Sequence, residues 1–253
     1  MPLDHLADEV YARLARAGCV AADEETRELL AAVPDDETLE SWVQRREFGE
    51  PLAWILGKID FCGLSIQVDA GLYVPRLQSQ ELARRAVELL PQNGYAADLC
   101  TGVGAIAAYI SHMVPNAVVV GTDLDFMAVR CARRNGVRAT VGDLGSCLRS
   151  GIFDLVSVIA PYVPTDQLYL LPKDVQHFEP ILALDGGVDG LAKLHRSIDH
   201  AQRILRTGGW FLAEVGGTQD QLIESTLRSA GFGHFSSWYD EDGDLRGISA
   251  QLK

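Results

Sequence analysis

One stretch near the middle of the chain constrains its fold more than any other. Residues 98–105, Asp-Leu-Cys-Thr-Gly-Val-Gly-Ala, have the pattern of an apolar strand end, a glycine turn and a helix start. Glycines such as Gly102 and Gly104 let the backbone turn sharply and approach a ligand where a Cβ atom would clash. Nineteen residues after Gly104, the apolar run 117–123 ends in a second carboxylate, Asp123. Because a carboxylate placed there can hold a ribose hydroxyl pair, the pattern predicts a nucleoside pocket.

Strand and helix patterns alternate through most of the chain. Strands are predicted at 96–100, 117–122, 138–141, 153–159 and 210–215, with helices at 78–90, 104–113, 125–135, 189–206 and 219–229. Such alternation predicts an α/β fold, a Rossmann-like parallel sheet with helices on both faces. The last two strands, 235–239 and 245–252, flank the hairpin loop 240–244. We therefore expect a seven-stranded sheet that ends in a C-terminal antiparallel hairpin.

The first part of the chain has a different pattern, with apolar residues at helical spacing and a plausible helix stop at Gly18. We expect a small helical domain over 1–58, followed by a β-hairpin connector at 59–75 and the sheet domain at 76–253. Within the connector, 61–68 alternates like a strand and 71–75 is its expected hairpin partner. The helical domain carries thirteen acidic residues against six basic ones, which predicts either an acidic docking surface or an ordinary solvated face.

Composition excludes several classes of protein. The 253 residues are 47% apolar with no run of 18 apolar residues, so no membrane span is expected. The net charge of −13 argues against nucleic acid as a partner. Five scattered cysteines without a C-x-x-C pair predict reduced thiols and no metal site, and the N-terminus has no signal-peptide pattern. Together these features predict a cytoplasmic protein.

The glycine turn is compatible with two cofactors. Gly102–Ala107 also fits the G-x-G-x-x-A dinucleotide pattern, but Asp98 would then face a pyrophosphate. Asp143 follows the third strand, where its carboxylate could accept a hydrogen bond from an adenine amine. Three acids around a glycine turn favour S-adenosylmethionine over NAD, because it carries a sulfonium and an ammonium group and no phosphate. The cofactor-binding candidates are Asp98, Cys100, Thr101, Gly102, Gly104, Asp123, Leu124, Gly142, Asp143, Leu144 and Arg76.

Six segments resemble one protein family: residues 49–57, 61–64, 74–76, 98–105, 179–191 and 208–215. They are similar to the HemK/PrmC protein-(glutamine-N5) methyltransferases, which modify the Gly-Gly-Gln loop of peptide-chain release factors. The resemblance spans nearly the whole chain and implies a class I methyltransferase fold. It also implies that the N-terminal helical domain contacts a protein substrate.

The chain departs from this family where the acceptor is bound. The family has Asn-Pro-Pro-Tyr at the end of the fourth strand, whereas this chain has Ile159-Ala160-Pro161-Tyr162. The resemblance implies that the asparagine binds the acceptor amide together with a backbone carbonyl of the same motif. Isoleucine has no donor or acceptor, and losing one buried polar contact costs about 1–3 kcal/mol. Cys100 also replaces a glycine of the family's turn, so we expect cofactor binding to survive and glutamine recognition to be altered.

The expected reaction is in-line transfer of a sulfonium methyl group to an acceptor near Tyr162, whose ring could face the sulfonium. A hydroxyl, acidic carbon or imidazole acceptor would need a base, for which His177 is the candidate by position. The catalytic candidates are therefore Ile159, Ala160, Pro161, Tyr162 and His177. A release factor or other protein substrate and a small-molecule or peptide acceptor of N-, O- or C-methylation both remain open. A catalytically silent binding protein is a third possibility.

Overall fold

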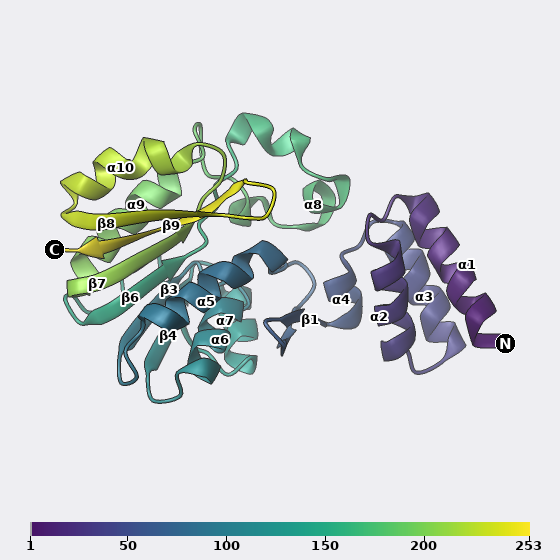
Figure 1. Cartoon of the computed structure of the whole chain (residues 1–253). Coiled ribbons are helices and arrows are strands. Elements are labelled where there is room, and N and C mark those ends of the chain that lie inside the picture. Colours follow the sequence, from purple (N-terminus) through teal and green to yellow (C-terminus); the bar gives the residue numbers. More distant parts are fainter. Residues whose placement is uncertain (1) are drawn as a thin grey trace.

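The structure, a computed structural model, describes the backbone of residues 2–253 and the side chains of residues 5–253. Four helices form a separate bundle at the N-terminus (Figure 1). They are α1 (Pro2–Ala17), α2 (Ala22–Ala32), α3 (Asp36–Glu47) and α4 (Leu52–Leu56). Their apolar faces share one core that includes Leu14 and Leu29. Asp35 caps α3 by accepting a hydrogen bond from the Thr38 backbone N–H at 2.8 Å.

The connector is a hairpin, but its strands differ from the predicted ones. Strand β1 (Lys58–Phe61) pairs with β2 (Leu64–Gln67), and the segment 71–75 forms no strand. The prediction that 71–75 pairs with 61–68 is therefore wrong. Its physical reason is the turn at Cys62 and Gly63, whose φ angles of 53° and 78° reverse the chain inside the alternating run.

A seven-stranded sheet forms the larger domain, in the order β5-β4-β3-β6-β7-β9-β8. Its strands are β3 (Tyr95–Leu99), β4 (Val118–Asp123), β5 (Arg138–Val141), β6 (Phe153–Val158), β7 (Leu205–Glu214), β8 (Phe232–Tyr239) and β9 (Leu245–Leu252). The first five are parallel to one another, and β9 is antiparallel to both β7 and β8. The predicted α/β class and the C-terminal antiparallel hairpin are confirmed.

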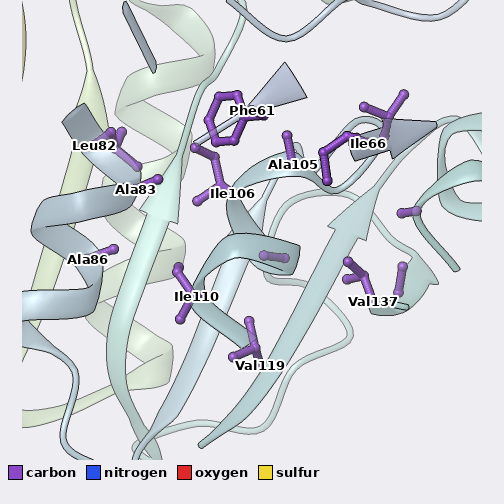
Figure 2. Packing of buried hydrophobic residues seen from close by; sticks show 14 of the residues in the cluster. Phe61, Ile66, Leu82, Ala83, Ala86, Ala105, Ile106, Ile110, Val119 and Val137 are labelled. Carbon is purple, nitrogen blue, oxygen red and sulfur yellow. The ribbon is translucent and has the colours of Figure 1, made fainter. Parts of the chain in front are cut away.

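Helices cover both faces of the sheet. The covering helices are α5 (Gln80–Leu89), α6 (Ala105–Met113), α7 (Phe126–Arg134), α9 (Ala192–Ile204) and α10 (Gln219–Ser229). On one face α5, α6 and α7 share one apolar cluster with the strands and the connector. Figure 2 shows residues of α5 and α6 in this cluster near the connector residue Phe61. On the other face α9 and α10 pack against a second apolar cluster. None of the helices in the described part of the chain is long and apolar enough to cross a membrane.

The strand order places a crevice at one edge of the sheet. The chain runs from β3 outward to β4 and β5, and then returns to β6 on the other side of β3. Connections that leave neighbouring strands in opposite directions open a ligand crevice at the carboxyl ends of those strands. Between β6 and α9 the chain forms three short helices near this edge, η2 (Thr165–Leu170), α8 (Lys173–Phe178) and η3 (Ile181–Ala183).

Candidate cofactor and acceptor site

A cavity of about 810 Å³ lies at the carboxyl ends of β3, β4, β5 and β6. Four groups of residues that directly follow these strands line it, and it continues to the loop between α1 and α2. The sheet-edge lining comprises Asp98, Cys100, Thr101, Gly102, Asp123, Leu124, Gly142, Asp143, Leu144, Ile159, Ala160, Pro161 and Tyr162. The structure thus brings together nearly all the predicted site residues. The volume of the cavity falls within the range of about 300–1,000 Å³ that is usual for ligand sites.

The two glycines of the turn have different roles. A Cβ atom added to Gly104 would lie 2.9 Å from Val137 and 3.0 Å from Ala132, so this glycine allows the turn to pack closely on neighbouring elements. A Cβ atom added to Gly102 would meet nothing within 4 Å, and Gly102 lines the cavity. Its φ of 54° favours glycine, and its open face lets a ligand approach the backbone.

Asp123 is held in place by backbone N–H groups of the glycine turn and of its own loop. Its Oδ2 accepts a hydrogen bond from the Gly102 backbone N–H at 2.8 Å, and its Oδ1 accepts one from the Asp125 N–H at 2.9 Å. Burial raises the pKa of the Asp123 carboxyl, whereas these backbone donors lower it. Asp125 separately caps α7 by accepting from the Met127 N–H. Asp125 therefore supplies the cap of α7, and Asp123 is not needed for that role.

Asp98 is almost completely buried beneath the turn, with 2% of its surface exposed. It pairs in register with Ser157 of β6, whose hydroxyl donates to Asp98 Oδ1 at 2.8 Å. The Thr101 hydroxyl donates to Oδ2 at 2.6 Å. Burial raises the pKa of Asp98 to about 6, although both hydroxyl groups oppose that shift. Since none of the described residues forms an ion pair with Asp98, a cationic ligand group suits this position.

Asp143 has one oxygen occupied and one free. Arg196 of α9 donates to Asp143 Oδ2 at 2.6 Å, a contact that the sequence pattern did not reveal. The other oxygen, Oδ1, is buried and has no hydrogen-bond partner among the described residues. Asp143 also lines the cavity, so its carboxylate keeps acceptor capacity at the position expected for an adenine amine. Leu124 and Leu144 supply apolar surface to the cavity beside the two carboxylates.

The cavity wall is apolar at Ile159 and Ala160, the two positions where the chain departs from the Asn-Pro-Pro-Tyr motif. Ile159 packs against the core cluster on the α5–α7 face, and Ala160 is buried. The backbone carbonyls of Ile159 and Ala160 accept no hydrogen bond from any described residue. These carbonyl oxygens therefore have unused acceptor capacity, whereas the side chains of Ile159 and Ala160 offer no polar group.

The segment 184–190 packs against the loop that follows β6, residues 159–163, which we call the acceptor loop. Val163 donates its N–H to the Leu184 carbonyl at 3.1 Å and accepts from the Gly186 N–H at 2.8 Å. A Cβ atom at Gly186 would lie 2.7 Å from the Pro161 carbonyl, and one at Gly190 would collide with the Tyr162 carbonyl. These glycines permit a close backbone contact that determines where Pro161 and Tyr162 lie.

Sequence analysis did not identify a buried polar cluster behind Tyr162. The Ser79 hydroxyl donates to Glu214 Oε2 at 2.5 Å, and the other oxygen of Glu214 is buried without a partner among the described residues. Burial raises the pKa of both Glu214 and Tyr162, and the Glu214 charge raises that of Tyr162 further. The only sequence signal was a carboxylate at the end of an otherwise apolar strand.

Arg76 and His177 differ in their positions. Arg76 lines the cavity, donates to Glu179 Oε1 at 2.5 Å and lies 4.9 Å from the centre of the Tyr73 ring. It therefore forms part of the cavity wall through contacts within the protein. His177 is exposed on α8 and does not line the cavity, although its neighbours Asp174 and Val175 do. The structure therefore does not place His177 in the cavity wall with Tyr162.

The arrangement fits S-adenosylmethionine. A buried carboxylate, a ribose-type carboxylate held by the glycine turn and a free carboxylate oxygen beside apolar surface match its cationic tail, ribose and adenine. The part of the chain that the structure describes contains no cluster of His, Cys, Asp or Glu that could hold a metal ion.

Comparisons with known proteins agree with this site. Residues 77–157 match the model of the methyltransferase small domain family. Release factor glutamine methyltransferase of Geobacter sulfurreducens is 33% identical over 216 residues, which are 83% of this chain and 76% of that protein.

Two solved structures share the fold. A methyltransferase from Pyrococcus furiosus has a TM-score of 0.55 at 18% identity, over 75% of this chain and 89% of its own. A Thermus thermophilus 16S rRNA N2 G1207 methyltransferase, in complex with AdoMet and guanosine, has a TM-score of 0.52 at 20% identity, over 78% of this chain and 44% of its own. With the site and the relatives together, the chain belongs to the release factor glutamine methyltransferase family and is an S-adenosylmethionine-dependent methyltransferase.

Proposed function

We propose that this methyltransferase modifies a side chain presented on a protein loop that enters between the helical domain and the sheet. The observation that carries the proposal is the continuity of the cavity. It extends from Gly102 at the glycine turn to the α1–α2 loop, residues 17–21, in the helical domain. A release factor glutamine is the first acceptor to test, because the relatives are release factor glutamine methyltransferases. In this proposal the units 1–58, 59–75 and 76–253 act as substrate-binding domain, connector and cofactor-binding domain.

The protein's own contribution is to position the reactants. When bound, the cofactor supplies a methyl group on a sulfonium centre. We assign its tail, ribose and adenine to Asp98, Asp123 and Asp143, with Leu124, Leu144 and the glycine turn as the walls. The Ile159 and Ala160 carbonyls receive the acceptor N–H, and the Tyr162 ring borders the acceptor. Alignment of reacting atoms in an enclosed site supplies most of the rate in such a reaction.

Ile159 makes glutamine a weak acceptor under this proposal. An amide nitrogen is a poor nucleophile and needs a polar clamp, and isoleucine leaves the clamp with backbone carbonyls alone. We expect slow transfer of a labelled methyl group from S-adenosylmethionine to a release factor, and an increase of about tenfold or more in Ile159→Asn. Ile159→Val is the matched control and should change the rate little. If neither the natural protein nor Ile159→Asn labels the release factor, a glutamine acceptor is excluded.

A second candidate is methylation of a small molecule or peptide. The observation that favours it is the apolar acceptor end, where Ile159 joins the core cluster and Ala160 is buried. If this candidate is correct, we expect the labelled methyl group in the small-molecule fraction of a cell extract, while the release factor stays unlabelled. Label that remains entirely with protein after extraction would contradict it.

A further inference from the structure

Lys193 is a cation on the cavity wall that the proposed function does not use. It lies in the first turn of α9, directly after the segment that holds the acceptor loop. Ala192 at the start of this helix donates its N–H to the Gly186 carbonyl at 3.1 Å. Arg196, three residues later, pairs with Asp143 at 2.6 Å. Because residues three apart are neighbours on a helix, Lys193 lies one turn from the Asp143 ion pair, half-buried and lining the cavity.

The charges around the cavity single out Lys193. Four basic residues line the cavity: Arg46, Arg76, Lys173 and Lys193. Arg46 pairs with Glu25 and Arg76 pairs with Glu179, so both guanidinium groups are neutralised.

The two lysines form no ion pair with any described residue, but they lie at different ends. Lys173 is exposed on α8, the helix whose Asp174 and Phe178 approach Gly49 of the helical domain. Lys193 lines the cavity together with Cys100 and Gly102 of the glycine turn. Burial raises the pKa of the Cys100 thiol and the nearby Lys193 charge opposes that rise. The Lys193 charge also acts on Asp185, whose pKa is lowered mainly by the hydrogen bond from Thr165, but the two form no ion pair. Lys193 is thus a cation without an ion-pair partner among the described residues, in the wall of a cavity that three carboxylates also line.

S-adenosylmethionine carries two cationic groups and one anionic group, its α-carboxylate. Asp98, Asp123 and Asp143 attract the cationic groups and repel this carboxylate. A ligand carboxylate entering such a site requires a cation, and the unpaired lysine at the sheet edge provides one. We propose that Lys193 binds the α-carboxylate of S-adenosylmethionine and so selects the intact amino-acid tail. This inference rests on the cofactor and is independent of which acceptor is methylated.

The test compares two ligands that differ only in that carboxylate. Isothermal titration calorimetry of the full chain would measure the affinities for S-adenosylmethionine and for decarboxylated S-adenosylmethionine. We expect the natural protein to prefer S-adenosylmethionine by about 10- to 100-fold, the range of one charge-assisted hydrogen bond. Lys193→Met should abolish this preference, and Lys193→Arg should retain part of it. Lys173→Met, the matched control, should leave the preference unchanged.

The ratio of the two affinities within one protein keeps the test informative. A partly unfolded preparation lowers the binding stoichiometry for both ligands, and the ratio stays the same. The inference is overturned if the natural protein binds both ligands equally, or if Lys193→Met keeps the preference for S-adenosylmethionine. An equal loss of affinity for both ligands in Lys193→Met would also overturn it, since the lysine would then support the site without touching the carboxylate. Because methyl transfer is not measured, failure here leaves the proposed acceptor unaffected.

Discussion

Single carboxylates beneath the glycine turn are the residues on which cofactor binding depends most. Asp98 is enclosed by Ser157 and Thr101, which donate hydrogen bonds to it, and it has no cationic partner among the described residues. Burial therefore raises its pKa to about 6. A cationic ligand group beside this carboxylate would favour its ionised form and lower its pKa again.

This pKa predicts how cofactor affinity depends on pH. Below about pH 6 the Asp98 carboxyl of the free protein is protonated, so binding a cation must first release that proton. We expect the affinity for S-adenosylmethionine to rise as the pH increases from about 5 to 7 and then to level off. Asp98→Asn should bind more weakly at pH 7 and show a flatter profile. A profile in calorimetry that keeps the same slope in both proteins would assign the dependence to another group.

Residue-scale features also mark where sequence reasoning succeeded and failed. Asp98, Asp123 and Asp143 follow strands, and the carboxyl ends of parallel strands meet at one edge, so their proximity was predictable. The contacts of Arg196 with Asp143 and of Glu214 with Ser79 were not predictable. In each pair the two residues lie far apart in the sequence, and no local pattern marks the contact. The backbone conformation of Cys100 was not predictable either. Its φ of 54° lies in the left-handed region, which residues other than glycine rarely adopt.

At the scale of elements, the loop after β6 depends on the glycines that pack against it. Gly190 has a φ of 72°, and a Cβ atom there would collide with the Tyr162 carbonyl. The sequence shows the glycines of 186–190, but only the structure shows what they approach. Elements with strong periodicity, such as α10 and β5, were predicted to the residue. The hairpin of β1 and β2 was not predicted correctly. The alternating pattern of 61–68 is compatible both with a continuous strand and with a turn at Cys62 and Gly63.

The close contact at Gly190 gives a stability prediction with a matched control. Gly190→Ala has both the positive-φ cost and the collision with the Tyr162 carbonyl, and we expect a loss of about 2–4 kcal/mol in unfolding free energy. Gly243→Ala has a φ of 84° and open space around the added Cβ atom, so we expect only about 1 kcal/mol. Chemical denaturation of both variants would measure the difference. Equal losses would mean that the Tyr162 loop moves away at no cost.

At the scale of the whole molecule, the helical domain is joined to the sheet domain through Trp54. This residue of α4 is mostly buried, its indole N–H donates to the Leu72 carbonyl at 3.0 Å, and its ring meets Phe178 of α8 edge-on at 6.0 Å. One side chain thus contacts the connector and the segment near the acceptor loop. The proposed division into domains came from the sequence patterns, whereas the contact of α8 with the helical domain was found only in the structure.

Trp54 should therefore contribute strongly to global stability. Trp54→Ala removes a buried aromatic ring, and we expect the unfolding free energy to fall by about 3–5 kcal/mol. Trp54→Phe keeps much of the packing and loses the hydrogen bond to Leu72, so we expect a smaller loss of about 1–2 kcal/mol. Denaturant titrations followed by circular dichroism would compare them. A Trp54→Ala protein as stable as the natural one would show that the two domains do not depend on this contact.

Binding measurements on Asp123 variants test most directly whether the cavity binds S-adenosylmethionine. Calorimetry would compare the natural protein with Asp123→Asn and with Asp125→Asn, the same substitution two residues away at the α7 cap. Asparagine caps a helix as well as aspartate does, so we expect Asp125→Asn to bind S-adenosylmethionine almost normally. Asp123→Asn loses the charged acceptor for the ribose hydroxyls and should bind about tenfold or more weakly. Equal affinity of Asp123→Asn and the natural protein, or no binding by the natural protein, would contradict the assignment of this cavity to S-adenosylmethionine.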